Sequence, residues 1–114
     1  MNKTIKAKWT KALREGKYKQ GQGRLYRVND QGEQLYCCLG VLCDLYAAET
    51  HTPWEKDTSQ TYTMHNHQSF LPNQVIEWAE IKYGTIGLPT DLLIDMNDGG
   101  KTFEEIAEVI EKRL

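Results

Sequence analysis

The stretch from Tyr36 to Tyr46, YCCLGVLCDLY, carries the longest apolar run of this 114-residue chain. Its hydrophobic side chains recur at helical spacing and leave almost no polar face: Leu39, Leu42, Leu45 and Tyr46, with Cys38, Val41 and Ala48 around them. A helix that is apolar nearly all round is normally buried on every side. We therefore expect residues 38–49 to form the central helix of the protein.

The segment before this helix carries the pattern of a β-hairpin. Leu25–Val28 and Glu33–Cys37 are typical of two strands, and the Asn29-Asp30-Gln31-Gly32 sequence between them is typical of a turn. Farther along, Thr61–His65 fits a strand and a loop about equally, and Phe70-Leu71 is compatible with another short strand. The sequence thus predicts a small antiparallel sheet beside the central helix.

An amphipathic helix is expected at the start of the chain, over residues 4–15. Its apolar positions fall on one face: Ile5, Trp9, Ala12 and Leu13. Thr4 is available as the N-terminal cap, and Gly16 suits the left-handed position after the helix end.

Three further helices are expected in the second half of the chain. Pro72 can open the first, which carries Val75, Ile76, Trp78 and Ala79. The second runs from Pro89 through Met96 and stops at Asn97-Asp98-Gly99-Gly100, while the residues before it, 83–88, read as a loop or a short strand. In the third, over residues 102–113, Thr102 and Glu105 form a capping box.

These elements indicate an α+β fold, with four to five helices around a small antiparallel sheet or hairpin. The length and a hydrophobic share of 39% fit one domain over residues 1–114. No apolar run approaches the ~20 residues that cross a bilayer, and no secretory signal is recognisable. We expect a buried core containing Trp9, Leu13, Leu39, Leu42, Leu45, Ile106 and Ile110.

Charge is distributed unevenly along the chain. Residues 1–27 hold nine of the fourteen basic residues and one acid, whereas residues 28–114 hold five bases and fifteen acids. A basic segment can attract phosphate groups although the net charge is −2. The alternative is a solvated helix face that balances acids elsewhere in the same fold. The overall acidity argues against nucleic acid as the partner.

Residues that often carry catalysis or bind metals lack the spacing that those functions need. Cys37, Cys38 and Cys43 form no C-x-x-C pair, so we expect buried thiols in a reduced cytoplasmic protein. His65 and His67 would face one side only if a strand runs through them, and are otherwise surface polar residues. No nucleophile elbow, zinc-peptidase or Walker motif is present. We predict no catalytic residue, no metal site and no cofactor.

The loop from Gly16 to Arg24 is the most suggestive candidate site. Its glycines let backbone N–H groups converge on an anion, and its basic side chains add positive charge. Tyr18 or Tyr36 would stack on a base of the ligand, and Asn97 or Asp98 would hydrogen-bond to a polar edge of the ligand. The candidate ligand-binding residues are Lys17, Tyr18, Gln20, Gly21, Arg24, Tyr36, Asn97 and Asp98. The alternative is a plain connector whose glycines form caps and turns.

Four blocks of the chain also carry a resemblance. They are Trp9 to Leu13, Gly16 to Gly21, the Cys-Cys-Leu-Gly-Val-Leu-Cys block at residues 37–43 and the Asn-Asp-Gly-x-x-x-Phe-x-x-Ile-Ala block at residues 97–107. Together they resemble a family of small uncharacterised proteins carried by tailed bacteriophages and prophages. The resemblance implies a phage accessory protein made in the host bacterial cytoplasm, and it transfers no assigned activity.

Two functional hypotheses follow. The first is a non-enzymatic protein that sequesters a small phosphorylated ligand, such as a cyclic nucleotide signal of host immunity. The second is an inhibitor or adaptor that binds a host protein through its acidic body. Neither involves a membrane, and both leave a homo-oligomer open. Under the ligand-binding hypothesis, Arg24→Ala, Lys17→Ala and Gly21→Val should weaken binding. The fold should stay intact, because the loop lies outside the predicted core.

Overall fold

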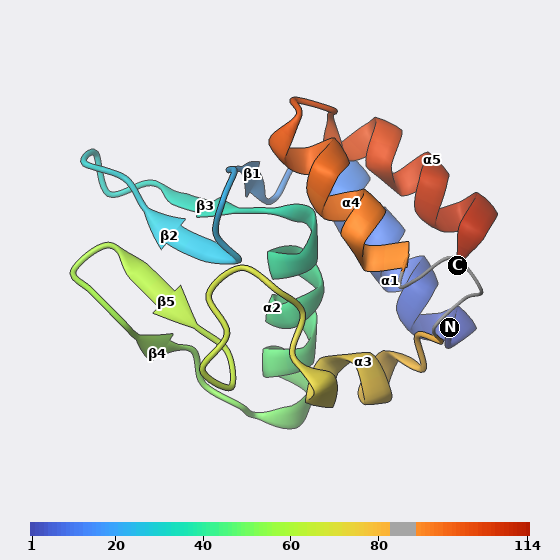
Figure 1. The fold of residues 1–114 in the computed structure, drawn as a ribbon, viewed down its shortest axis with the longest axis horizontal. Helices are drawn as coiled ribbons and strands as arrows, with labels where there is room; N and C mark the ends of the chain where they lie inside the picture. The colour runs from blue at the N-terminus through green and yellow to red at the C-terminus, as the bar shows by residue number, and fades with distance from the viewer. Residues whose placement is uncertain (83–88) are drawn as a thin grey trace.

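The structure, a computed structural model, describes residues 1–82 and 89–114. Helix α2 (Cys38–Thr50) runs through the middle of the molecule, between a sheet and most of the other helices (Figure 1). Its residues from Cys38 to Cys43 are all buried, as the apolar sequence predicts. The expectation for residues 83–88 lies outside the described residues.

The sheet has five short strands in the order β1-β3-β2-β5-β4. They are β1 (Lys19–Gln20), β2 (Tyr26–Val28), β3 (Gln34–Tyr36), β4 (Glu55–Lys56) and β5 (Thr61–Thr63). The predicted hairpin is confirmed, with Tyr26 opposite Tyr36 and Val28 opposite Gln34. The sheet is mixed and not purely antiparallel, because β1 runs parallel to β3. Two-residue strands such as β1 and β4 carry no alternation that a sequence pattern could show.

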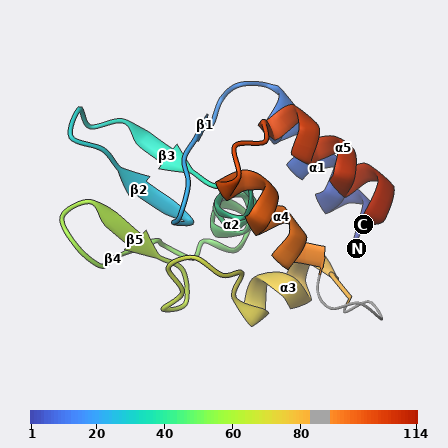
Figure 2. The same ribbon diagram turned by 45° about the horizontal axis from the view of Figure 1, so that its top comes forward.

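Helices α1 (Lys3–Arg14) and α5 (Phe103–Arg113) lie side by side at the end of the molecule away from the sheet (Figure 2). They bury Trp9, Leu13, Ile106 and Ile110 in the common core, as predicted. The capping box of Thr102 and Glu105 is also confirmed at the start of α5. Asn2, and not the predicted Thr4, caps α1 by accepting from the backbone N–H of Ile5 at 3.0 Å.

Gly40 allows α2 to meet the sheet at very close range. A Cβ atom at this position would lie 1.7 Å from the carbonyl oxygen of Leu25, the residue just before β2. On the other side of α2, the Trp9 indole N–H donates to the carbonyl of Cys38 at 2.9 Å. These two contacts tie the first turns of α2 to both halves of the molecule.

Helices α3 (Asn73–Ala79) and α4 (Pro89–Asp98) complete the fold, and the predicted helix after Pro72 is confirmed. Phe70-Leu71 forms no strand, and β5 ends at Thr63. Leu45 is half-buried, where the sequence predicted a core residue. In residues 1–82 and 89–114, no helix combines the length and the apolar composition that membrane crossing requires.

The two histidines do not share a strand face. His65 and Asn66 have φ values of 49° and 66°, and Met64 and His67 exchange two backbone hydrogen bonds of 2.9 and 3.1 Å. This pattern closes a tight turn with left-handed dihedrals at its two central residues. The His65 ring lies 2.9 Å from the hydroxyl of Tyr46, a partner that strand geometry did not suggest.

Candidate functional site

Asn97, in the last turn of α4, joins three segments that are distant in the sequence. Its Nδ2 donates to the carbonyl of Gly21 at 2.8 Å, and its Oδ1 accepts from the Cys38 amide at 3.1 Å and from Gln20 Nε2 at 2.9 Å. The side chain is fully buried. Three predicted ligand residues therefore come together, but they bond to one another and to the start of α2.

Gly21 has a structural role in this network. It is buried, and a Cβ atom added to it would lie 2.8 Å from Leu35 Cβ on β3. Its amide also donates to the carbonyl of Tyr36 at 2.8 Å. The expectation that the whole loop lies outside the core therefore does not hold at Gly21, and Gly21→Val would disturb the sheet edge.

Arg24 and Asp98 line a small hollow next to this network, together with Gly23, Cys37, Ser69, Ile94 and Asn97. The hollow has a volume of about 20 Å³. That is room for one water molecule. The amide of Gly23 donates to Asp98 Oδ1 at 3.1 Å, and the Ser69 hydroxyl donates to the carbonyl of Gly23 at 2.7 Å. The loop thus already holds an anionic group, the carboxylate of Asp98.

In the described part of the chain, four of the nine basic residues of the first 27 positions pair with an acid, and two of them, Lys11 and Lys17, share Glu15. Arg14 pairs with Glu104 and Glu111 on α5, and Lys19 pairs with Glu33. The ammonium of Lys17 lies 3.7 Å from Glu15. For Arg14 and Lys19, these pairs fit a face that balances acids elsewhere in the fold.

Arg24 differs from the paired cations. Its guanidinium donates to the side-chain oxygen of Gln68, and in the described part of the chain no carboxylate oxygen lies within 4.0 Å of it. It is half-buried at the rim of the hollow.

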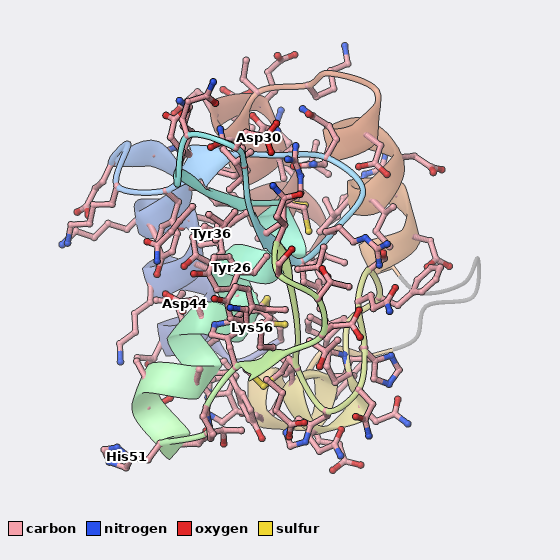
Figure 3. The ribbon with its side chains drawn as sticks, turned by 90° about the vertical axis from the view of Figure 1, so that its left-hand side faces the viewer. Tyr26, Asp30, Tyr36, Asp44, His51 and Lys56 are labelled. Atoms are coloured by element: carbon pink, nitrogen blue, oxygen red, sulfur yellow. The ribbon has the colours of Figure 1, made fainter. Side chains whose placement is uncertain are left out.

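The predicted aromatic residues belong to a second group, on one face of the sheet (Figure 3). Tyr26 stacks on Tyr36 and on Tyr62, with centroid separations of 4.6 and 4.5 Å. These separations follow from the ~4.7–4.9 Å spacing of neighbouring strands, since the three residues are cross-strand partners. Tyr18 meets Tyr36 edge-on at 4.9 Å. Tyr36 is only 8% exposed, so it offers little ring face to a base.

Asp44 of α2 is the acidic centre of this group. Its Oδ2 accepts from the Tyr18 hydroxyl at 2.6 Å, and its Oδ1 accepts from the Trp54 indole N–H at 3.0 Å. Burial raises the pKa of Tyr18, and the hydrogen bond to Asp44 raises it further. Burial also raises the pKa of Tyr36, with a smaller contribution from the Asp44 charge.

Sequence reasoning did not select Asp44 or Trp54. The available indication was the position of Asp44, which is the only acid among residues 37–48 of an otherwise apolar segment. A charge at such a position needs partners, because transferring it from water without them is costly. The partners themselves come from the loops at residues 17–18 and 51–54, and no local pattern links these loops to α2.

The three cysteines are free and buried, as expected. Burial raises the pKa of Cys37 to about 11 and raises that of Cys38 and Cys43 as well. The Cys37 sulfur caps α2 by accepting from the Gly40 amide at 3.3 Å. In residues 1–82 and 89–114, no three His, Cys, Asp or Glu side chains are grouped as metal ligands would be.

The predicted site residues therefore divide into two groups. Gln20, Gly21, Arg24, Asn97 and Asp98 surround the hollow, Tyr18 and Tyr36 surround Asp44, and Lys17 joins neither. Comparison with curated proteins and with solved structures found no significant match to the chain. The chain belongs to the family described as a domain of unknown function, DUF8296, whose model matches residues 1–114.

Proposed function

We propose that this protein is a phage accessory protein that binds, without transforming it, a small ligand carrying a phosphate group, and that the phosphate lies at the hollow beside Arg24. The observation that carries the proposal is the hydrogen bond from the Gly23 amide to the Asp98 carboxylate. An amide that holds one anion beside an arginine is suited to hold another, because both recognise negatively charged oxygens.

Arg24 supplies the charge for this role. A guanidinium has five N–H donors, and the described contacts use the one that points to Gln68. The remaining donors can grip a phosphate through two hydrogen bonds. Gln68 is in turn held by Asp57, whose carboxylate accepts from Gln68 Nε2 at 3.0 Å. The hydrogen bond to Asp57 thus fixes the Gln68 side-chain amide, which in turn positions the Arg24 guanidinium.

The size of the hollow limits what enters it. About 20 Å³ admits a single small group, so the rest of the ligand would lie on the surface. A phosphate would compete with Asp98 for the Gly23 amide. In the host cytoplasm, such binding would sequester a cyclic nucleotide or a related signal of host immunity.

Calorimetry against cyclic dinucleotides, cyclic trinucleotides and ADP-ribose derivatives tests the proposal. Arg24→Ala should weaken binding about 10- to 150-fold, since a contact to a charged group contributes about 1.5–3 kcal/mol. Asp98→Asn should strengthen binding, because it removes the competing charge. Lys17→Ala is the matched control and should change affinity little. Binding to none of these compounds, or equal affinity in Arg24→Ala and the parent protein, would refute the proposal.

The second candidate function is an adaptor or inhibitor that binds a host protein. Phe70 favours it, because its side chain is 63% exposed in the loop before α3. A large exposed aromatic residue is typical of an interface anchor. Phe70→Ser should abolish capture of a specific host protein from lysate and leave nucleotide binding unchanged. Capture that is unaffected by Phe70→Ser would contradict this candidate.

A further inference from the structure

We propose that Asp44 and the rings of Tyr18 and Trp54 form a binding site for a cationic organic group, a guanidinium or an ammonium. This site is separate from the hollow beside Arg24 and does not depend on the phosphate proposal. Figure 3 looks onto the part of the molecule where Tyr26, Tyr36 and Asp44 lie.

The charge of Asp44 has no cationic partner among the described residues. Each carboxylate oxygen accepts one hydrogen bond, from the Tyr18 hydroxyl and from the Trp54 indole, and both donors are neutral. In residues 1–82 and 89–114, no Lys, Arg or His nitrogen lies within 4.0 Å of this carboxylate. A carboxylate oxygen can accept a second hydrogen bond, so capacity for a cation remains.

The aromatic rings beside Asp44 also suit a cation. Trp54 and Tyr18 are fixed to the two oxygens of one carboxylate, so their rings flank it from different loops. Trp54 also lies edge-on to Tyr26, with centroids 5.2 Å apart. The faces of such rings attract cations within ~6 Å through the ring quadrupole. Tyr18, Asp44 and Trp54 are half-buried, so the group is accessible to a small ligand and partly shielded from water.

The same features exclude other ligands. An anion would meet the Asp44 charge, and a purely apolar group would bury that charge further without a partner. An internal competitor does exist, because Lys56 is the cross-strand partner of Tyr62 and its side chain is on the same face of the sheet as the tyrosines. Lys56 is exposed, and replacing it should leave Asp44 more available to an external cation.

The indole N–H signals in a ¹⁵N-correlated NMR spectrum report on the site directly. The probe is N-acetylargininamide, and its control is the citrulline analogue, which has nearly the same shape but no charge. We expect the Trp54 signal to move saturably with the arginine probe only. The Trp9 signal should stay in place, because that side chain is fully buried against α2.

Variants sharpen the titration. Asp44→Asn keeps the shape of the side chain and should weaken binding of the arginine probe at least about tenfold, whereas Lys56→Ala should strengthen it. Arg24→Ala should leave this titration unchanged, because Arg24 is not part of the Asp44 group. The titration therefore tests the cation proposal independently of the phosphate proposal. Equal shifts from the arginine and citrulline probes would overturn the proposal whether or not Asp44→Asn folds. Full-strength binding by a folded Asp44→Asn variant would overturn it as well.

Discussion

Asn97 and Asp44 are each a single polar side chain that contacts segments remote in the sequence, yet the two regions around them differ in kind. Asn97 is fully buried and neutral, and its amide makes three hydrogen bonds to Gly21, Cys38 and Gln20. Asp44 is half-buried and charged, and its two contacts are neutral donors. The hydrogen bonds of the first region are satisfied by the fold itself, whereas no cation of residues 1–82 and 89–114 pairs with the charge of the second.

Burial and charge together distinguish a structural network from a ligand site. A neutral amide with good partners contributes to stability wherever it is buried, because its desolvation is offset by the bonds it makes. An unpaired carboxylate at half exposure contributes less to stability but can still bind a cation. The predictions below test this division by breaking one region at a time.

The largest effect is expected where both regions depend on one close contact. Gly40→Ala would place a Cβ atom 1.7 Å from the Leu25 carbonyl oxygen, so α2 and the sheet must separate. We expect a loss beyond the ~1–3 kcal/mol usual for overpacking, and most of the variant unfolded. Urea unfolding measures it. Gly21→Ala is the milder comparison, because the atom it meets belongs to the Leu35 side chain; equal losses would contradict this ranking.

Asn97→Ala should be the next most damaging change. It leaves the Cys38 amide and the Gly21 carbonyl without their partner, and each unsatisfied buried group costs about 1–3 kcal/mol. A total loss of about 2–6 kcal/mol in the free energy of unfolding is expected from denaturant titration. The neighbouring residue, Asp98, is exposed, so Asp98→Ala should lower the free energy of unfolding by less than about 1 kcal/mol. Similar losses for the two variants would mean that the Asn97 network is not structural.

High pH should weaken the region around Asp44. The folded-state pKa of Tyr18 and that of Tyr36 are raised above the ordinary value of 10.0 by burial and by the Asp44 carboxylate. The unfolded chain therefore loses these protons first, and stability that is complete below pH 10 falls as pH rises further. Urea unfolding at increasing pH, with tyrosinate absorbance in parallel, checks the direction. A tyrosinate titration at the ordinary value would contradict it.

Asp44→Asn should have the smallest effect on stability. The amide oxygen can still accept from the Trp54 indole N–H. The amide nitrogen can donate to the Tyr18 oxygen, so this second contact is kept with the donor and acceptor exchanged. We expect a change of less than about 1 kcal/mol in unfolding free energy, together with a lower pKa for Tyr18. A loss as large as that of Asn97→Ala would show that Asp44 is a structural residue like Asn97.

Much of the local structure could be predicted from neighbouring residues. The hairpin, the apolar α2 and the capping box of α5 all depend on side chains a few positions apart. The candidate site was harder, because Asn97 and Gln20 look equally polar whether they face a ligand or each other. The strand expected to run to His65 ends at Thr63 instead, because a left-handed turn begins at His65, and such a backbone carries no strong sequence mark at this residue.

The helices, the hairpin and the burial of the thiols follow from local sequence patterns, since hydrophobic periodicity and capping act over four residues or fewer. Which polar groups meet depends on the packing of the elements in three dimensions. Asn97 reaches Gly21 across 76 positions, and Asp44 reaches Tyr18 across 26. The close approach of Gly40 to Leu25 is of the same kind. Such contacts depend on how elements pack in three dimensions, and that packing leaves no periodic trace in the chain.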